Sequence, residues 1–495
     1  MKLRIAGHSD RYALEQLQLC LFPDEPMEYT ERAFSGDGAV SSLHRGKVYL
    51  TATARITKDG TTAKASKRLP LTEETYALRR RILQQSYYLA AIQLLERRPP
   101  WGALSGVRPT KLTSRRLLAG DPPEQAARWM EEHFFVTPER SRLCTEASAA
   151  TVQTVSKLSA QDVSVYIGIP FCPTRCAYCS FVSQTAGNAG ALLSPYLDCL
   201  EREIAHTGRL LKASGRTVRA LYIGGGTPTT LNTEQITRLM RAIKTHFDLD
   251  RLIEYTVEGG RPDTLDPEKL KAIRNLGATR ISINPQTMND TVLKAVGRRH
   301  TAAQTAETYR QAVEAGFASI NMDLIAGLPG ESPESFANSL LQVIGLHPSN
   351  ITVHTLALKK GADLFGTRIG LRTVGEMTQM VDFAEQTLRQ AGYRPYYLYR
   401  QKYMSGSFEN VGWCRDGDIG LYNICMMEEL HSIVSLGGGA MSKVKLSETK
   451  LERFHNPKFP KEYTERIDGV LAQKDALFRL LTEQDENSPK KEQEK

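Results

Sequence analysis

The chain has 495 residues, more than one ordinary domain needs, and this length predicts two or three domains. Hydrophobic residues make up 41% and charged residues 24%, as in a soluble globular protein. No run approaches the ~20 apolar residues of a membrane helix, and the N-terminus MKLRIAGHSDRY lacks the apolar core of a signal peptide. We therefore expect a cytoplasmic protein with no membrane span. The net charge of +9 permits nucleic acid, lipid or an acidic small molecule as a partner and does not choose among them.

Residues 1–155 predict a separate α+β domain of unknown role. KVYLTATARIT alternates like a strand, and LRRRILQQSYYLAAIQLLERR has the spacing of an amphipathic helix. PPWGALSGVRPTKL is a loop punctuated by Pro and Gly and carries basic residues. Solvated helix faces explain the Arg and Lys residues of this domain, so we do not expect nucleic acid as a partner.

Residues 156–372 alternate β-rich apolar runs with amphipathic helical stretches. This alternation is typical of βαβ units and a parallel sheet. Six units predict an incomplete (β/α)6 parallel barrel, because a closed barrel has eight. The six runs are VSVYIGIP (163–170), VRALYIGGG (218–226), EYTVEGG (254–260), RISINPQ (280–286), SINMDLIAG (319–327) and NITVHTLAL (350–358).

The last part of the chain reads as an extension of this barrel. Residues 373–482 begin with the helical pattern VGEMTQMVDFAEQTLRQAG and continue into a stretch rich in Gly, Tyr and Asn. We expect a mostly helical or irregular region that covers the substrate. Residues 483–495 are polar, contain no aromatic residue and are predicted to be disordered.

Three of the eight cysteines crowd into eight residues directly after the first run, in IPFCPTRCAYCSF. The thiolates of Cys172, Cys176 and Cys179, in a C-x3-C-x2-C arrangement on a loop, can converge on one inorganic cluster. A structural zinc site would need a fourth Cys or His, and none lies close in sequence. Three ligands on a four-iron cluster leave one iron open for the amino and carboxylate groups of a cofactor or substrate. We therefore predict a metal cluster, and the alternative is three buried structural cysteines.

This motif resembles the signature of radical S-adenosylmethionine enzymes. Together with YIGGGTPT, RISINPQTMNDTVLKAVGRRH and NMDLIAGLPGE, it resembles oxygen-independent coproporphyrinogen III oxidases and their relatives. WGALSGVRPTKL and ENVGW…GLYNI…MEE have counterparts in the clade of HemZ-type coproporphyrinogen dehydrogenases. The resemblance implies a [4Fe-4S] cluster and S-adenosylmethionine as cofactors.

Polar and glycine residues at the ends of the predicted strands suit a cofactor pocket. Three consecutive glycines end the second run, and missing side chains let exposed N–H and C=O groups hold an amino acid moiety. Arg298 supplies a cation that suits a carboxylate. By resemblance, the positions that bind S-adenosylmethionine or lie near the cluster are Tyr166, Tyr178, Gly225, Gly226, Thr227, Glu258, Gln286, Arg298, Asp323 and Ala357.

The resemblance also implies the reaction. A reduced cluster cleaves S-adenosylmethionine to methionine and a 5′-deoxyadenosyl radical, and the protein orients the cofactor. In the coproporphyrinogen oxidases this radical removes a β-hydrogen from a propionate, and loss of CO2 and one electron leaves a vinyl group. Two rounds convert coproporphyrinogen III to protoporphyrinogen IX, in anaerobic haem biosynthesis. We expect no catalytic residue beyond the cluster and cofactor, an electron donor protein such as a flavodoxin or ferredoxin, and contacts of Arg400 and Lys402 with the tetrapyrrole carboxylates.

Some positions depart from the family pattern and keep other functions open. Where well-characterised members carry a fourth cysteine this chain has Phe181, as haem chaperones of the family do, and a usual histidine is Gly168. The later histidine element of the chaperones is replaced by Met441, and Cys414 and Cys425 read as ordinary thiols. The alternatives to the decarboxylase are a haem-binding chaperone and a radical methyltransferase that acts on a porphyrin or RNA.

Overall fold

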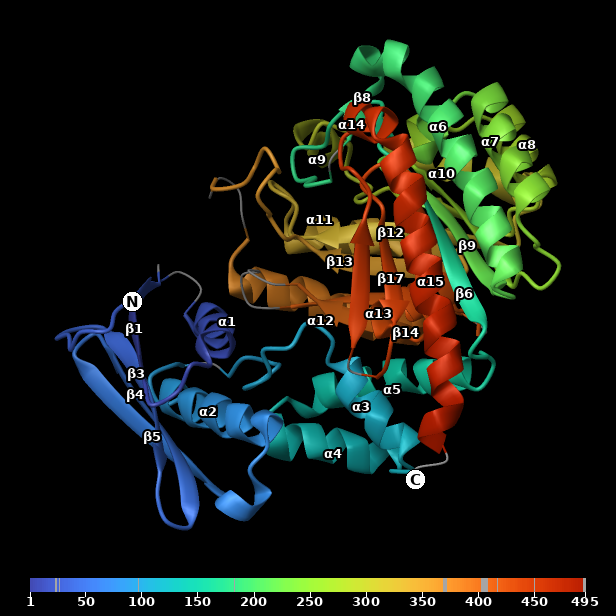
Figure 1. The fold of residues 1–495 in the computed structure, drawn as a ribbon. Coiled ribbons are helices and arrows are strands. Elements are labelled where there is room, and N and C mark those ends of the chain that lie inside the picture. Colours follow the sequence, from blue (N-terminus) through green and yellow to red (C-terminus); the bar gives the residue numbers. More distant parts are fainter. Residues whose placement is uncertain are drawn as a thin grey trace. The chain divides into compact units, whose positions relative to one another are not determined.

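The computed structural model describes residues 1–492 apart from 23–24, 26, 97, 182, 368–371, 402–407, 416 and 449. The chain forms two compact units (Figure 1). The first contains Met1–Val152 and Leu398–Asn410, and the second contains Gln153–Tyr397 and Val411–Lys495. The chain therefore leaves the second unit once, after residue 397, to add a short segment to the first.

The first unit contains a five-stranded sheet in the order β2-β1-β3-β4-β5. Its first three strands are parallel neighbours, and β3, β4 and β5 form an antiparallel meander. The strands are β1 (Lys2–Ala6), β2 (Glu28–Tyr29), β3 (Gly38–Arg45), β4 (Tyr49–Lys58) and β5 (Thr61–Pro70). The helices are α1 (Arg11–Leu21), α2 (Tyr76–Ala91), α3 (Thr110–Leu118), α4 (Pro123–Phe134) and α5 (Pro138–Val155), the last of which runs across the boundary between the units.

Hydrophobic alternation builds the core of the first unit. On β4, Leu50, Ala52, Ala54 and Ile56 are buried, because every second side chain of a strand faces the same side. Helix α2 packs on β4 and β5. The strand and the helix expected in KVYLTATARIT and LRRRILQQSYYLAAIQLLERR are thus confirmed.

The second unit contains an eleven-stranded sheet in the order β14-β15-β13-β12-β11-β10-β9-β6-β16-β17-β18. All six predicted runs are strands of this sheet, and they lie side by side and parallel in chain order. Their carboxyl ends therefore meet at one edge, where the site described below is built. They are β6 (Asp162–Ile169), β9 (Thr217–Gly225), β10 (Glu254–Gly260), β11 (Arg280–Ile283), β12 (Ser319–Ala326) and β13 (Asn350–Thr355).

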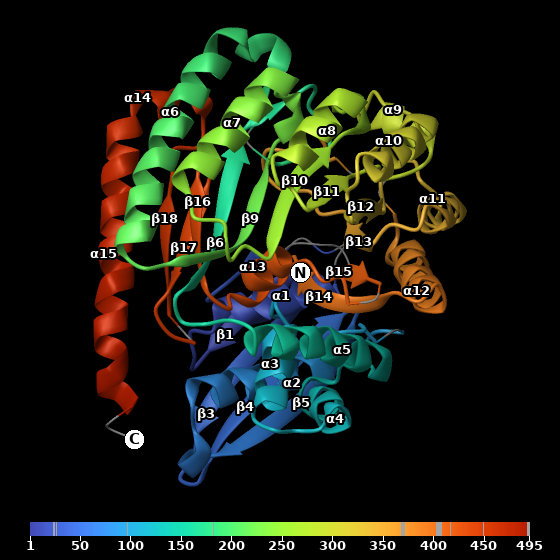
Figure 2. The same ribbon diagram turned by 90° about the vertical axis from the view of Figure 1, so that its right-hand side faces the viewer.

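Helices connect these parallel strands and follow one another along the outer side of the sheet (Figure 2). Their starts are encoded locally. Asn232 with Gln235 and Thr301 with Gln304 form capping boxes, and Asp266 caps the helix that begins at Pro267. The helices are α6 (Ala186–Ala213), α7 (Thr233–His246), α8 (Pro267–Asn275), α9 (Asp290–Ala295), α10 (Ala302–Glu314), α11 (Pro333–Gly345) and α12 (Val374–Gln390).

Most residues of the C-terminal region are helical or irregular, and the region also contributes strands to the same sheet, which we did not predict. β15 pairs antiparallel with β13 at one side, and β16 pairs parallel with β6 at the other. These strands are short and polar on one side, and only pairing with a partner distant in sequence identifies them. The elements are β14 (Arg394–Arg400), β15 (Glu409–Cys414), α13 (Leu421–Glu428), β16 (Ser432–Leu436), β17 (Met441–Lys445), β18 (Leu451–His455), α14 (Pro460–Glu465) and α15 (Ile467–Glu492).

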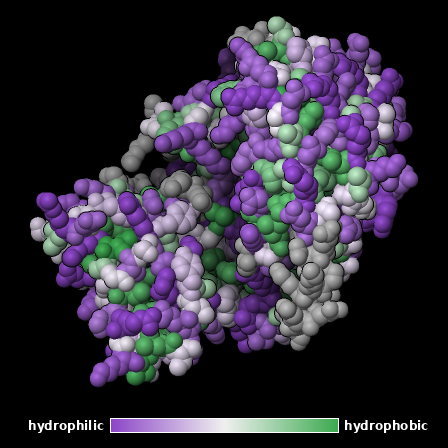
Figure 3. All heavy atoms as spheres, in the orientation of Figure 1, coloured by the Kyte–Doolittle hydropathy of each residue, from purple (hydrophilic) through white to green (hydrophobic). Residues whose placement is uncertain are grey.

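Helix α15 also includes much of the tail that we predicted to be disordered, since it runs to Glu492, and it packs on α6. No helix of the described chain is long and apolar enough to span a membrane. On the face shown in Figure 3, hydrophilic residues cover most of the surface, and hydrophobic residues form only small groups.

Candidate functional site

The three clustered cysteines lie in the loop that follows β6. Pro170 ends this strand, and the short strand β7 (Phe171–Cys172), paired with β8 (Gln184–Thr185), carries the first thiol. Cys172, Cys176 and Cys179 are all free and half-buried, and the N–H of Cys179 donates to the carbonyl of Cys176 at 3.0 Å. A metal cluster can therefore reach all three from the carboxyl edge of the parallel sheet.

Burial controls the ionisation of two of these thiols, those of Cys172 and Cys179. It raises the pKa of Cys179 to about 11, and it raises the pKa of Cys172 although Ser183 and Thr227 donate hydrogen bonds to that sulfur. Both thiols are therefore protonated at neutral pH without metal, and iron binding must displace their protons. Neighbouring thiolates of the set raise these pKa values further, which shows that the three sulfurs lie near one another.

Among the described residues no three His, Cys, Asp or Glu side chains converge on one point that could hold a single metal ion. A four-iron cluster does not require such convergence. Each thiolate binds a different iron, so the sulfurs of a cluster site stand further apart than those of a zinc site. The absence of such convergence among the described residues is therefore compatible with a four-iron cluster.

The glycine turn after β9 lies directly against the cysteine loop. The N–H of Gly226 donates to the carbonyl of Ile169 at 2.8 Å, and that of Thr227 to the carbonyl of Phe171 at 2.7 Å. A Cβ at Gly226 would lie 2.6 Å from the Phe171 oxygen and 2.9 Å from the Cys172 sulfur, so only glycine fits. These two N–H groups are used within the protein, contrary to our expectation that they are exposed for a ligand. The turn can offer carbonyl oxygens instead, which suit an ammonium group.

Two half-buried residues with carboxyl groups, Glu258 on β10 and Asp323 on β12, lie near this turn. Burial raises the pKa of Glu258 to about 8, and the charge of Asp323 adds to the shift. Burial alone would raise the pKa of Asp323 too, but His354 and Asn321 lower it below its ordinary value. The Asn321 amide donates to Asp323 Oδ1 at 2.7 Å, and His354 Nε2 lies 3.8 Å from Oδ2. At neutral pH Asp323 is thus charged, whereas Glu258 holds a proton for much of the time.

Gln286, which follows β11, has a strained backbone. Its φ of 70° is one that side-chain-bearing residues rarely adopt, and two hydrogen bonds of 2.9 Å, to the Asp323 carbonyl and from the Ile325 N–H, hold it there. Its buried Oε1 has no hydrogen-bond partner in the described chain. An unsatisfied buried oxygen on a strained residue is typical of a ligand-binding position.

Arg298 joins the cysteine loop to two strand ends. Its guanidinium donates to the Tyr178 hydroxyl at 2.9 Å and to the carbonyls of Gly260 and Asn284 at 3.0 and 2.8 Å. Only 6% of this residue is exposed, and its Nε has no hydrogen-bond partner in the described chain. The structure thus brings together the predicted residues Tyr178 and Arg298.

Aromatic rings line the sheet beneath these groups. Tyr166 stacks on Tyr222 and on Tyr422 with centroid distances of 6.2 and 6.1 Å, and Tyr222 stacks on Tyr422 at 4.6 Å. Sequence reasoning found Tyr166 and missed Tyr222, Tyr422 and His354. The position of Tyr222, two residues before the glycines and on the same face as Gly224, was an available signal. Tyr422 gave none, because it comes from α13, far along the chain.

The remaining predicted residues lie elsewhere or outside the description. Ala357 follows β13 and is half-buried. Arg400 belongs to the first unit, where its buried guanidinium stacks on Trp101 and donates to the Leu104 carbonyl at 2.6 Å. A side chain held in this way braces its own unit, and contact of Arg400 with a tetrapyrrole carboxylate stays a prediction. Lys402 lies outside the described residues.

Gly168, which stands where the family usually has a histidine, lies in crowded surroundings. A Cβ at this position would lie 3.3 Å from the carbonyl oxygen of Gly438 and 3.4 Å from the Tyr166 ring. The Gly168 carbonyl accepts a hydrogen bond of 2.6 Å from Tyr196, whose hydroxyl also accepts one from the N–H of Gly438 at 2.8 Å. The turn after β16 thus leaves little room for a histidine here.

A cysteine loop and a glycine turn at the carboxyl edge of a parallel sheet define the class of protein. The model of the radical SAM superfamily matches residues 166–343. The oxygen-independent coproporphyrinogen-III oxidase-like protein HemZ of Bacillus subtilis is 39% identical over 394 residues, which are 78% of this chain and 79% of that protein. The chain therefore belongs to the family of HemZ-type, oxygen-independent coproporphyrinogen-III oxidase-like proteins within the radical SAM superfamily.

Other relatives of this family match less of the chain. The heme chaperone HemW of Haemophilus influenzae is 29% identical over 61% of this chain and 75% of its own. The solved structure of coproporphyrinogen III oxidase (HemN) from Escherichia coli, described as a radical SAM enzyme, is 27% identical and has a TM-score of 0.52. That match covers 65% of this chain and 73% of the other.

Membership of the superfamily gives the chain a [4Fe-4S] cluster and S-adenosylmethionine as cofactors. The residues present fit both groups. The three free thiols supply cluster ligands, and the cradle at Gly226 has no space for a side chain beside Cys172. The orphaned Oε1 of Gln286 and the carboxylate of Asp323 supply acceptors for the hydroxyl and ammonium groups of the cofactor.

Proposed function

We propose that this chain oxidatively decarboxylates two propionate side chains of coproporphyrinogen III to give protoporphyrinogen IX. The observation that carries the proposal is the extent of the match to HemZ, which covers 78% of the chain and so extends well beyond the residues 166–343 common to the superfamily. We propose an electron donor protein such as a flavodoxin or ferredoxin as a partner. The six parallel strands and their helices are, in this proposal, an incomplete (β/α)6 barrel.

When bound, the cluster and S-adenosylmethionine supply an adenosyl radical that can abstract a hydrogen atom. The residues of the chain bind and orient these groups. Asp323, which His354 and Asn321 keep anionic, accepts hydrogen bonds from ribose or ammonium donors. Glu258, protonated for much of the time at neutral pH, can donate a hydrogen bond or accept one. The stacked tyrosines keep water from the floor of the site.

The test is a reaction without oxygen. The reconstituted protein receives S-adenosylmethionine, a low-potential reductant and coproporphyrinogen III, and protoporphyrinogen and 5′-deoxyadenosine are measured together. We expect both products from the native chain and neither from a Cys176→Ala variant. Formation of deoxyadenosine with an unchanged tetrapyrrole would contradict the proposed substrate while leaving the cofactor chemistry intact.

A haem-binding chaperone is the second candidate. The observation that favours it is Phe181, which is 69% exposed and stands where decarboxylating members of the family carry a further cysteine. One haem per chain, bound tightly by a protein that leaves coproporphyrinogen III unchanged, would support the chaperone and contradict the decarboxylase.

A further inference from the structure

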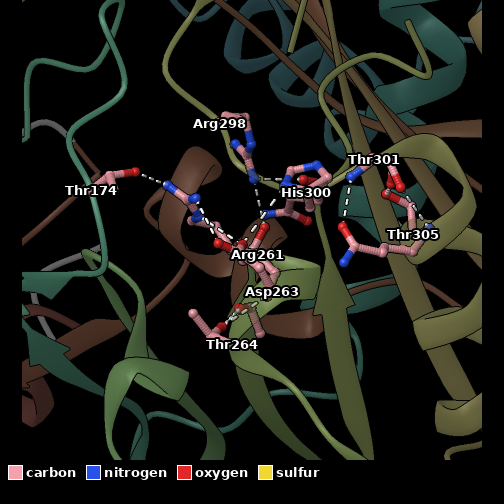
Figure 4. Close-up of polar contacts among 12 residues, drawn as sticks. Thr174, Arg261, Asp263, Thr264, Arg298, His300, Thr301 and Thr305 are labelled. Carbon is pink, nitrogen blue, oxygen red and sulfur yellow. Dashed lines mark hydrogen bonds and ion pairs between the residues drawn. The ribbon is translucent and has the colours of Figure 1, made fainter. Parts of the chain in front are cut away.

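Thr174 connects the cysteine loop to two other segments through its side chain, and Figure 4 shows its contact with Arg261. This residue stands between the first two cluster ligands, Cys172 and Cys176. Its hydroxyl donates to the carbonyl of Gly297 at 3.1 Å and accepts a hydrogen bond from Nη1 of Arg261. The single hydroxyl thus ties the segment between two ligands to the end of α9 and to the loop after β10.

Arg261 is itself held rigidly. Its side chain is only 3% exposed, and Asp263 accepts two hydrogen bonds from it, from Nε at 2.9 Å and from Nη2 at 2.8 Å. The fully buried ring of His300 lies behind this carboxylate, with its Nδ1 3.8 Å from Asp263 Oδ1. A two-pronged ion pair fixes the plane of a guanidinium, so the remaining Nη1 of Arg261 points in one direction, toward Thr174.

The end of α9 approaches the cysteine loop so closely that it needs a glycine. Gly297 has a φ of 80°, and a Cβ there would lie 3.0 Å from the carbonyl oxygen of Arg175. Beside it, the Val296 carbonyl accepts a hydrogen bond of 3.1 Å from the N–H of Ala177. The loop therefore rests on a firm backbone surface, and Thr174 is one point at which a side chain fixes it there; the exposed Arg175, which contacts Gly361 and Asp363, is another.

We propose that Arg261, oriented by Asp263, is a positioning residue that acts through Thr174 to hold the segment between the first two cluster ligands in place before iron binds. A free loop would lose conformational entropy when the cluster orders it, and a loop already fixed loses less. None of these three residues is among the positions that the family resemblance assigned to the cofactors. The inference concerns cluster retention and does not depend on the identity of the substrate.

The experiment compares two substitutions at one position. Thr174→Val keeps the size of the side chain and removes both hydrogen bonds, whereas Thr174→Ser keeps the hydroxyl. Each reconstituted protein is exposed to an iron chelator, and the rate of cluster loss is followed by absorbance. Supporting partners of metal ligands typically change metal affinity about 10- to 100-fold. We expect the Val variant to lose its cluster faster by a factor in this range and the Ser variant to resemble the native protein.

A second readout and a control separate positioning from folding. Electron paramagnetic resonance of the reduced cluster, with and without S-adenosylmethionine, should change in the Val variant and not in the Ser variant. Thr291→Val serves as the matched control. Thr291 is exposed on α9, and its backbone N–H, not its hydroxyl, donates to the side chain of Asn289. Metal-free variants are compared by circular dichroism and thermal unfolding, and Asp263→Asn replaces the Val variant if the latter does not fold.

Native-like cluster retention in Thr174→Val would overturn the proposal. A Ser variant as defective as the Val variant would overturn it too, because the hydroxyl would then not be the group that matters. Loss of activity with unchanged cluster retention and unchanged resonance spectra would also contradict it.

Discussion

The two edges of the parallel sheet in the second unit differ in how their polar groups are satisfied. At the carboxyl edge, Gln286 Oε1, Arg298 Nε and both ring nitrogens of His300 are buried without a hydrogen-bond partner in the described chain. At the amino edge, Arg280 on β11 donates to Asp418 at 2.8 Å and to Asn350 on β13. Unpaired buried groups cost stability and are tolerated where a ligand completes them. We infer that the cluster around Gln286 and Arg298 at the carboxyl edge serves binding, whereas the Arg280 cluster at the amino edge serves stability.

The Arg280 cluster forms a closed network, although Arg219 Nε and the Tyr255 hydroxyl at the same edge are buried without a hydrogen-bond partner in the described chain. Asp418 also accepts from Ser319 at 2.7 Å, and Glu254 lies 3.8 Å from Arg280 and accepts from the first N–H groups of α13. Helix α13 carries Tyr422, so this network also positions a ring that faces the site from below. The network consists of Glu254, Arg280, Ser319, Asn350 and Asp418. In the described chain, every buried polar side-chain atom of these five residues has a hydrogen-bond partner.

The largest expected effect is at the carboxyl edge. Cys176→Ala should remove the iron cluster and all formation of 5′-deoxyadenosine, because two thiolates cannot hold a four-iron cluster that binds three. Iron content and deoxyadenosine are measured after anaerobic reconstitution. Cys199→Ala is the control, since Cys199 is also free and half-buried but lies on α6. Full iron content in Cys176→Ala would contradict the assignment of the cluster ligands.

The amino edge should respond in stability rather than chemistry. Arg280→Met leaves the buried carboxylate of Glu254 without its cation and should lower the free energy of unfolding by about 3 kcal/mol. The iron content of the folded variant should stay native. Arg310→Met, which removes an exposed pair with Glu307, should change the stability little, because solvent screens the pair. Equal losses in the two variants, measured by denaturant unfolding, would remove the distinction between the two edges.

The pH dependence of stability should reveal the buried carboxyl of Glu258. Its folded-state pKa of about 8 lies above its ordinary value of 4.5, so its contribution is fully present below pH 4.5 and is lost as pH rises toward 8. Glu258→Gln is neutral at every pH and should remove a slope of at most about 1.4 kcal/mol per pH unit across this window. Thermal unfolding at pH 5 and pH 8 measures the change.

Two further variants control this measurement. Glu307→Gln, at an exposed carboxyl with a lowered pKa, should leave the slope between pH 5 and pH 8 unchanged. Burial also raises the pKa of Glu331, to about 7. A Glu331→Gln variant therefore measures how much that carboxyl group contributes to the slope. A Glu258→Gln protein with the native slope would show that Glu258 is charged in the folded protein.

The smallest expected effect is the change in stability when the strained backbone of Gln286 is relieved. Gln286→Gly relieves a φ of 70° and should raise the free energy of unfolding by about 1 kcal/mol or less, because glycine adopts this conformation freely. It should also weaken the binding of S-adenosylmethionine, which equilibrium dialysis measures. His347→Gly relieves a similar φ of 59° in the turn after α11 and should gain stability without a change in cofactor affinity. Unchanged affinity in Gln286→Gly would contradict a ligand-binding role for this side chain.

Local patterns in the sequence determined the six parallel strands, their helices, the first-unit strand and helix, and the cysteine loop. Apolar runs, capping residues and a short ligand spacing each act over a few residues, so they can be read directly. The polar residues at strand ends followed from the same logic, since parallel strands present their carboxyl ends at one edge.

Tertiary structure alone decided the rest. The strands β14 to β18 are identified by partners up to hundreds of residues away, and Arg400 was expected at a substrate rim but is buried against Trp101. Likewise, the sequence places Thr174 between two cysteines, but only the structure shows that Arg261 donates a hydrogen bond to its hydroxyl. Long-range pairing and burial depend on which surfaces meet, and a linear pattern does not contain that information.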